Sequence, residues 1–257
     1  MVTSPRGKRY PWFLRSLRSF LQQTYGRKEL IIVLNRLANN ELRRAKSDIK
    51  KLGLQDVHIY HLEGEPNLGQ LRNFSLDKAH GDILVQWDDD DLSHPERIAS
   101  QVKILRKKSG VVYLQEAYHY IEPSGAFFWV NWKKNARANK FPAGIPQSIA
   151  FTKDIKIRYP ESGSQSSRNE DTAFYQKLLK SGVKNILFQK TKYPLYTYVY
   201  HGGNVFDSLH HVSLGRVHSV SKSQLLKNKK IICQQIRGLN LDPDRIRLYY
   251  DSGSIKS

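Results

Sequence analysis

Four consecutive aspartates, Asp88 to Asp91, follow the apolar run ILVQW in a chain whose formal net charge at pH 7 is +19. Adjacent carboxylates repel one another, and neither Lys nor Arg stands among the next few residues. Clustered carboxylates suit a hard divalent cation such as Mg²⁺ or Mn²⁺, which takes oxygen ligands and bridges substrate phosphates. Turn formation and helix capping explain Asp91 and at most one more of the four. We therefore expect this cluster to bind a metal ion.

Further segments hold other candidate site residues. Glu170 and Asp171 in NEDTAF stand at the start of an expected helix, where a carboxylate is either an ordinary capping residue or a general base that deprotonates a hydroxyl. His201 in YHGGN precedes two glycines; a lone histidine is more often structural, but a neutral imidazole also binds Mn²⁺. Arg72 in PNLGQLRN follows a junction between a loop and a helix, and such a helix start with a nearby Arg can bind phosphate. The Asn-x-Gly pattern in the same segment is also common in ordinary turns. The basic residues of TSPRGKR (3–9) can likewise meet a phosphate.

Strand-like and helix-like segments alternate in the first half of the chain and must position these residues. Short apolar runs predict buried strands, which span 29–35, 57–62 and 82–87. Helical periodicity of apolar residues predicts helices over about 13–21, 42–52 and 68–79. This alternation favours a mainly parallel sheet, in which ligands bind beyond the carboxyl ends of the strands. The four aspartates lie at such an end.

The second half of the chain changes character. After the aspartates, Ser93 and Glu96 in SHPE predict a capping box at the start of a helix. Further strands are expected at 111–115, 126–132, 148–153 and 185–189, with a helix over about 170–181. From about 206 onward the sequence is basic, and we expect it to be mostly helical. The aromatic segments FFWVNW (127–132) and FPAGIP (141–146) can line an acceptor cleft or belong to the core.

The composition narrows the class of protein. Lys and Arg outnumber Asp and Glu by 42 to 23, which implies an acidic partner: nucleic acid, an anionic membrane surface or a phosphorylated substrate. The single cysteine, Cys233, excludes an intramolecular disulfide and a cysteine-based metal site. The start has no apolar segment typical of a signal peptide, and no apolar run approaches the ~20 residues of a membrane span. We expect a cytoplasmic protein that at most contacts the inner face of the membrane peripherally.

Together these segments resemble the family-2 glycosyltransferases of the GT-A fold. The resemblance covers residues 1–205 and rests on the order of TSPRGKR, QTY with ELIIV, NLGQLRN with GDILVQWDDDDLSHPERI, NEDTAF and YHGGN. It implies an α/β fold with a mainly parallel central sheet flanked by helices. The nucleotide-sugar half would span about 1–110 and the acceptor half about 111–205, with 206–257 as a basic, mostly helical C-terminal extension.

The resemblance also implies a metal site. In that family a D-x-D-type motif holds the metal ion on a nucleotide-sugar diphosphate, and Asp88, Asp89 and Asp90 stand at its place. Asp90 would be the direct metal ligand, supported by Asp88, with Asp89 on the nucleotide sugar. His201 matches a late histidine that completes the metal shell in some members. The implied cofactor is a divalent cation, Mn²⁺ or Mg²⁺.

Catalytic and nucleotide-binding residues follow from the same resemblance. Asp171 corresponds to the family's base, with Glu170 beside it. Thr3 stands where the first strand meets the nucleotide, and Arg72 where a basic side chain approaches the base or ribose. Members often end the second strand in an Asp-Asp-Gly-Ser-like run whose acid contacts the base, whereas this chain has Asn35, which can hydrogen-bond a base edge. The chain begins almost inside the first strand, so we expect a few residues upstream.

The implied activity is an inverting, metal-dependent glycosyl transfer. A nucleotide-diphospho-sugar donor, most simply a UDP-sugar, would give its sugar to a hydroxyl of a glycan or lipid-linked acceptor in polysaccharide or glycoconjugate biosynthesis. A sugar nucleotidyltransferase of related α/β fold is the alternative and would release pyrophosphate. A basic nucleic-acid-binding protein is the weakest alternative, because the carboxylate clusters repel a phosphate backbone.

Overall fold

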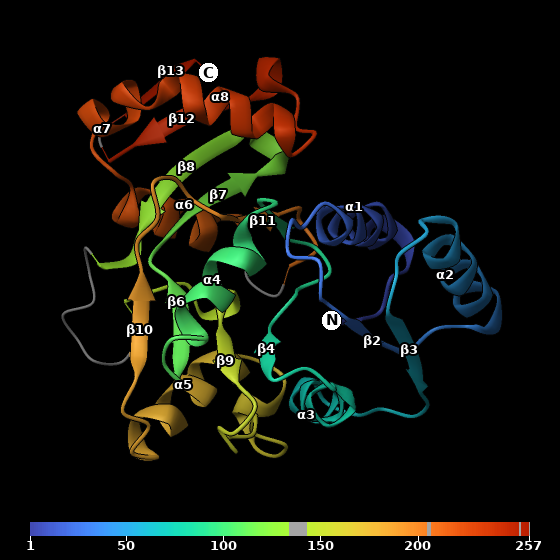
Figure 1. The fold of residues 1–257 in the computed structure, drawn as a ribbon. Helices are drawn as coiled ribbons and strands as arrows, with labels where there is room; N and C mark the ends of the chain where they lie inside the picture. Colours follow the sequence, from blue (N-terminus) through green and yellow to red (C-terminus); the bar gives the residue numbers. More distant parts are fainter. Residues whose placement is uncertain (134–142, 205–206, 252, 257) are drawn as a thin grey trace.

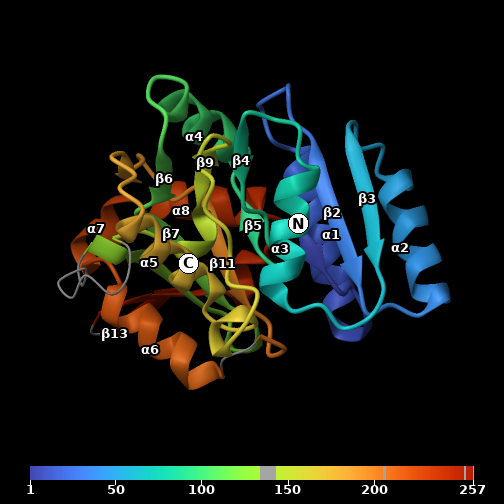
Figure 2. The same ribbon diagram turned by 90° about the horizontal axis from the view of Figure 1, so that it is seen from below.

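The computed structural model describes residues 1–133, 143–204, 207–251 and 253–256 (Figure 1). Its first sheet contains three parallel strands in the order β1-β2-β3: β1 (Val2–Thr3), β2 (Leu30–Asn35) and β3 (Val57–Leu62). Three helices cover this sheet: α1 (Tyr10–Leu21), α2 (Asn39–Lys51) and α3 (Leu68–Lys78). Figure 2 shows α2 outermost beside β3, with α3 near the second sheet.

Side-chain alternation along β2 explains this arrangement. Every residue of β2 is buried, as expected for a strand covered on both faces. Ile32 and Leu34 pack with residues of α1 and α2, whereas Ile31 and Val33 pack against Leu71 of α3. Because successive side chains of a strand point to opposite faces, one continuous apolar run forms the centre of a three-layer unit.

The second sheet has the strand order β10-β6-β9-β4. Its strands are β4 (Ile83–Val85), β6 (Val111–Leu114), β9 (Ala150–Thr152) and β10 (Ile186–Gln189). The helices α4 (Arg97–Leu105) and α5 (Glu170–Lys180) pack on its two faces, since Leu105 contacts Val112 and Phe174 contacts Phe151 in separate apolar clusters. The apolar sides of α4 and α5 thus cover the two faces of this sheet.

The third sheet has the order β13-β12-β8-β7-β11-β5 and includes the end of the chain. Its strands are β5 (Leu92–Ser93), β7 (Glu116–Ile121), β8 (Ala126–Asn131), β11 (Tyr196–Tyr200), β12 (Arg247–Tyr250) and β13 (Gly253–Lys256). The helices after residue 206 are α6 (Ser208–His218), α7 (Lys222–Lys227) and α8 (Lys229–Gly238). In the described part of this segment, two strands accompany the three α-helices, and β12 pairs in parallel with β8.

The α/β class with helices flanking the sheets is confirmed, and two details differ from expectation. Strand pairing is mixed rather than mainly parallel, because the β7–β8 hairpin and β9 insert antiparallel neighbours. The capping box at Ser93 and Glu96 is wrong: Ser93 belongs to β5, and α4 begins at Arg97. The Ser93 hydroxyl instead accepts a hydrogen bond from the Arg97 guanidinium. Because this charged group is buried, leaving it without partners would cost more free energy than leaving an exposed helix end uncapped.

A cavity of about 480 Å³ separates the first sheet from β4, lined among others by Met1, Ile31 and Leu84. The amino group of Met1 is buried beside it and donates to the Ile31 carbonyl at 2.8 Å. Burial, helped by the charge of Arg72, lowers the pKa of this amino group to about 5. Among the residues described here, no helix has the length and apolar character that crossing a bilayer requires.

Candidate active site

The carboxyl end of β4 brings the four aspartates to the junction of the sheets. The Ser16 hydroxyl of α1 donates to the Asp88 carbonyl at 2.7 Å and accepts from the Trp87 indole at 3.0 Å. These bonds fix the direction in which the chain leaves the sheet. The four side chains then take different partners, so the cluster is not one uniform patch of negative charge.

Asp89 and Asp90 share one arginine. The Arg9 guanidinium lies 2.8 Å from Asp89 and 3.2 Å from Asp90, and the Thr3 hydroxyl donates a hydrogen bond to Asp89. Nε2 of His201 lies 3.2 Å from the Asp90 carboxylate. Burial and the charge of Asp90 raise the pKa of Asp89 to about 6, against the opposing charge of Arg9. For Asp90, the hydrogen bond of His201 and the charge of Arg9 outweigh burial, so its pKa is lowered.

Asp91 turns away from the other three and holds β11. Its carboxylate accepts hydrogen bonds from the Tyr196 hydroxyl and, at 2.8 Å, from the Val199 amide. Burial and the charges of Asp90 and Asp88 raise its pKa well above the usual range. Asp91 therefore positions β11, and with it the YHGGN segment, rather than capping α4.

Arg72 links the aspartates to the start of α5. Its guanidinium lies 3.2 Å from Asp88 and 2.9 Å from Glu170, and its side chain is 12% exposed. Gln86 donates to both oxygens of Asp88 at 3.1 and 3.2 Å. The two carboxylates raise the pKa of Arg72 well above its usual value despite burial. Arg72 and Glu170 are 98 positions apart in the sequence, so this one cation joins the aspartates to a distant segment.

Asp171 lies in the first turn of α5, next to the buried Glu170. One oxygen accepts from the Thr172 amide at 2.7 Å and the other from the Gln147 side chain at 2.8 Å. Burial, followed by the charge of Glu170, raises the pKa of Asp171 to about 7, although Arg72 opposes this. A carboxyl that titrates near neutral pH can accept a proton and release it again.

A second cavity, of about 470 Å³, opens beside Asp171. Its walls include His119, Trp132 and Tyr198. His119 is buried, burial lowers its pKa to about 3, and its Nε2 has no hydrogen-bond partner among the described residues. Neutral imidazole and aromatic rings next to a carboxyl form a pocket that suits a ring with hydroxyl groups.

The two aromatic segments contribute unequally to this cavity. Phe127, Phe128 and Trp129 are buried in the core, and Val130 and Trp132 of FFWVNW line the cavity. From FPAGIP, Ile145 and Pro146 line it, whereas Phe141 and Pro142 lie outside the described residues.

Most of the predicted site residues fall into two hydrogen-bonded groups, which meet at the adjacent residues Asp88 and Asp89. One group contains Thr3, Asp89, Asp90 and His201, with Arg9 between the two aspartates, and the other contains Arg72, Asp88 and Glu170. Asp171 lies beside Glu170 and takes other partners, Thr172 and Gln147. Asn35 stands apart, because its amide donates to the Leu62 carbonyl at 2.8 Å and joins the ends of β2 and β3. Sequence reasoning missed several partners of this site, among them Arg9, Gln86 and Gln147. Arg9 had a signal, the basic run TSPRGKR, and Gln147 directly follows FPAGIP, a segment expected to line an acceptor cleft or to belong to the core.

The donor set fits a divalent cation on the His201 side of the cluster. Two ligand atoms of an octahedral cation, each about 2.1 Å from the metal, lie about 3 Å apart. The 3.2 Å between Asp90 Oδ2 and His201 Nε2 matches that separation. Trp12 stacks on His201 with ring centroids 5.8 Å apart, which holds the imidazole in place. Asp88 lies toward Arg72 instead, so a cation that bridges Asp88 and Asp90 competes with both arginines.

Comparison with known proteins identifies the family. The chain matches the model described as Glycosyl transferase family 2 over residues 7–160. A comparison with curated protein sequences gives no match. Among solved structures, TarS residues 1–349 from S. aureus in complex with UDP-GlcNAc gives a TM-score of 0.58 at 18% identity, covering 94% of this chain and 67% of that one.

A second solved structure, the mannosyltransferase PcManGT from Pyrobaculum calidifontis in complex with GDP-Man and Mn²⁺, gives a TM-score of 0.55 at 16% identity. The match covers 79% of this chain and 57% of that one. These likenesses concern the fold. Because the family model spans more than half of the sequence, the chain belongs to glycosyl transferase family 2, and it is a glycosyltransferase with the GT-A fold.

Proposed function

We propose that this enzyme is an inverting, metal-dependent glycosyltransferase that uses a nucleotide-diphospho-sugar donor. The observation that carries the proposal is the buried Arg72 bridge, which joins the β4 aspartates to the start of α5. It brings a metal-binding type of cluster next to Asp171, a carboxyl suited to proton transfer. Transfer of a sugar from a nucleoside diphosphate to a hydroxyl group needs a cation site for the diphosphate close to a base for the hydroxyl proton.

The donor half, about residues 1–110, supplies the diphosphate site. Asp88, Asp90 and His201 hold the divalent cation, Mn²⁺ or Mg²⁺, and Thr3 and Asp89 border the nucleotide sugar. When bound, the cation stabilises the negative charge that develops on the leaving nucleoside diphosphate. The solved structures with UDP-GlcNAc and with GDP-Man and Mn²⁺ support a donor of this class, and we propose a UDP-sugar.

Asp171 acts as the general base. Its carboxylate takes the proton from the acceptor hydroxyl as the oxygen attacks the anomeric carbon from the side opposite the diphosphate. Gln147 and the Thr172 amide orient the carboxylate, and Glu170 is held by Arg72. One displacement with no covalent enzyme intermediate inverts the anomeric configuration.

The acceptor binds in the cavity beside Asp171, between the half that spans about 111–205 and helix α6. Trp132 and Tyr198 offer ring faces there, which suit a glycan or a lipid-linked sugar. The basic segment 206–257 is proposed to contact an anionic membrane surface, where such an acceptor is held. This places the reaction in polysaccharide or glycoconjugate biosynthesis.

Product analysis tests the proposal. The purified protein is incubated with candidate nucleotide sugars, a glycan acceptor and Mn²⁺, and nucleotide products are separated by chromatography. Release of a nucleoside diphosphate that is abolished by EDTA and restored by Mn²⁺ supports the proposal, and NMR of the product reports the anomeric configuration. Release of pyrophosphate would contradict glycosyl transfer, and full activity in EDTA would contradict metal dependence. Retention of the anomeric configuration would contradict the inverting mechanism.

A further inference from the structure

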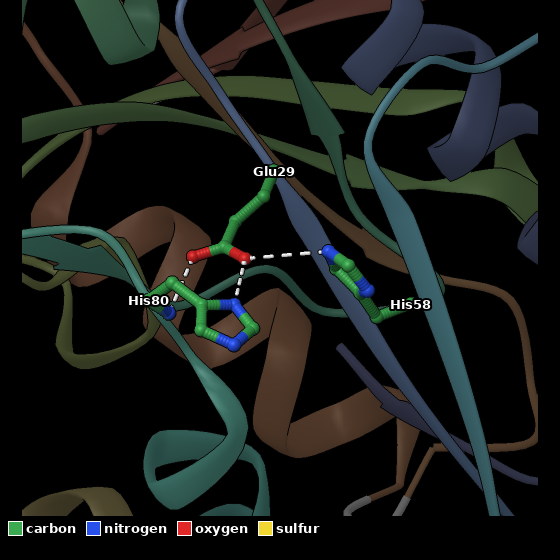
Figure 3. Close-up of side chains that lie close together, drawn as sticks. All are labelled: Glu29, His58 and His80. Atoms are coloured by element: carbon green, nitrogen blue, oxygen red, sulfur yellow. Dashed lines mark hydrogen bonds and ion pairs between the residues drawn. The ribbon is translucent and has the colours of Figure 1, made fainter.

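A second cluster of metal-binding side chains lies far from the aspartates. Glu29 immediately precedes β2, His58 is the second residue of β3, and His80 lies between α3 and β4 (Figure 3). All three stand at the amino-terminal ends of these strands, whereas the aspartates follow the carboxyl end of β4. A strand of six residues spans about 20 Å, so the two clusters occupy opposite edges of the fold.

The three side chains converge on one point. Oε2 of Glu29 lies 2.9 Å from Nδ1 of His80 and 3.6 Å from Nε2 of His58. All three ligand atoms lie within 4.8 Å of one another. In a tetrahedral site with bonds of about 2.1 Å, ligand atoms lie about 3.4 Å apart, so small side-chain rotations complete the geometry.

The carboxylate is already oriented for this role. Its other oxygen accepts hydrogen bonds from the backbone amides of His80 at 2.6 Å and Gly81 at 2.7 Å, which leaves Oε2 facing the two imidazoles. The two backbone amides thus hold the Glu29 carboxylate in this orientation. Outer hydrogen bonds of this kind commonly fix metal-binding carboxylates.

The three side chains are accessible from solvent, and they leave one coordination position of a metal ion open. The side chain of Glu29 is 20% exposed, that of His58 43% and that of His80 71%, so an ion reaches them from solvent. Two imidazoles and one carboxylate leave one tetrahedral position for water. This nitrogen-rich set favours Zn²⁺ over Mg²⁺ or Mn²⁺, which prefer oxygen ligands.

We propose that Glu29, His58 and His80 form a zinc site that ties the beginnings of β2, β3 and β4 together. The ion replaces the direct Glu29–His80 hydrogen bond by two metal–ligand bonds and adds His58. Binding to the folded state alone stabilises it, since the three ligands come from segments that are separate in the unfolded chain. The site is distinct from the proposed catalytic cation site, and the inference stands whether or not that function holds.

Zinc titration of the untagged, EDTA-treated and dialysed protein by calorimetry tests this proposal. We expect His58→Gln and His80→Gln each to weaken zinc binding at least tenfold. His61→Gln is the matched control, because it removes an imidazole from the opposite face of the same strand. Asp90→Asn separates the two sites: the zinc site should survive this change.

Thermal unfolding provides a second readout. Zinc should raise the midpoint of the wild type, Asp90→Asn and His61→Gln, but not of His58→Gln or His80→Gln. Unchanged midpoints without metal would establish that the variants fold, which the exposure of both imidazoles favours. Zinc affinity that is unaffected by both histidine substitutions, or that disappears in Asp90→Asn alone, would overturn the proposal.

Discussion

Replacing Asp171 by Asn should stop sugar transfer and make the folded protein more stable at pH 8. An aspartate whose pKa is higher in the folded than in the unfolded state destabilises the fold once the pH exceeds the unfolded-state value. The rise from 3.8 to about 7 sets an upper bound of about 4 kcal/mol, at about 1.4 kcal/mol per pKa unit. Because the carboxyl is only partly buried and water screens it, we expect about 1–2 kcal/mol.

The pH dependence of this gain follows from the sign of the pKa change. Below about pH 4 both states of the wild type carry the proton, so wild type and variant should unfold at equal urea concentrations. The difference should grow between about pH 4 and pH 7 and stay constant above, since only the wild type then buries a charge. Asn can keep both hydrogen bonds of Asp171. Its amide oxygen can accept from the Thr172 backbone amide, and the Gln147 side chain can rotate so that its oxygen accepts from the Asn amide nitrogen.

Urea unfolding at pH 4, 6 and 8 checks this, with Asp82→Asn as control because Asp82 is exposed. In the same samples, wild-type kcat/KM should fall tenfold per pH unit below about pH 7, whereas nucleotide binding should be normal in Asp171→Asn. A variant that is less stable than wild type at pH 8, or a stability difference that does not depend on pH, would refute the assignment of a raised pKa. Retained transfer activity would refute its role as base.

Three further perturbations address the other parts of the site. Asp90→Asn should weaken Mn²⁺-dependent nucleotide binding about tenfold or more in calorimetry, whereas Asp82→Asn should not. Arg72→Met should lower the free energy of unfolding by about 3–5 kcal/mol, because two buried carboxylates lose their cation; a loss below 1 kcal/mol would argue against the bridge. Gly69→Ala should cost about 2 kcal/mol or more, since its Cβ would lie 1.8 Å from the Pro160 carbonyl oxygen, while Gly26→Ala meets nothing within 4 Å.

Local patterns predicted the first sheet and its helices well. The β2, β3 and α3 elements lie where the apolar runs and the helical periodicity indicated, because burial on both faces of a strand or one face of a helix leaves a direct mark on the sequence. The strand β12 was not predicted, since its partner β8 lies about 120 residues earlier and no local pattern records that pairing. The residues Ser93 and Glu96 looked like a cap, but burial of Arg97 decided otherwise.

The sequence alone determined which chemical groups the site contains: the four aspartates, the Glu170–Asp171 pair and His201, in an order that indicated a family-2 glycosyltransferase. Only the tertiary structure decided which group serves which purpose. It turns Asp91 to β11, pairs Asp90 with His201, and joins Asp88 to Glu170 through Arg72. The physical reason is that an aspartate's charge state and partners depend on burial and on groups from distant segments, neither of which adjacent residues specify.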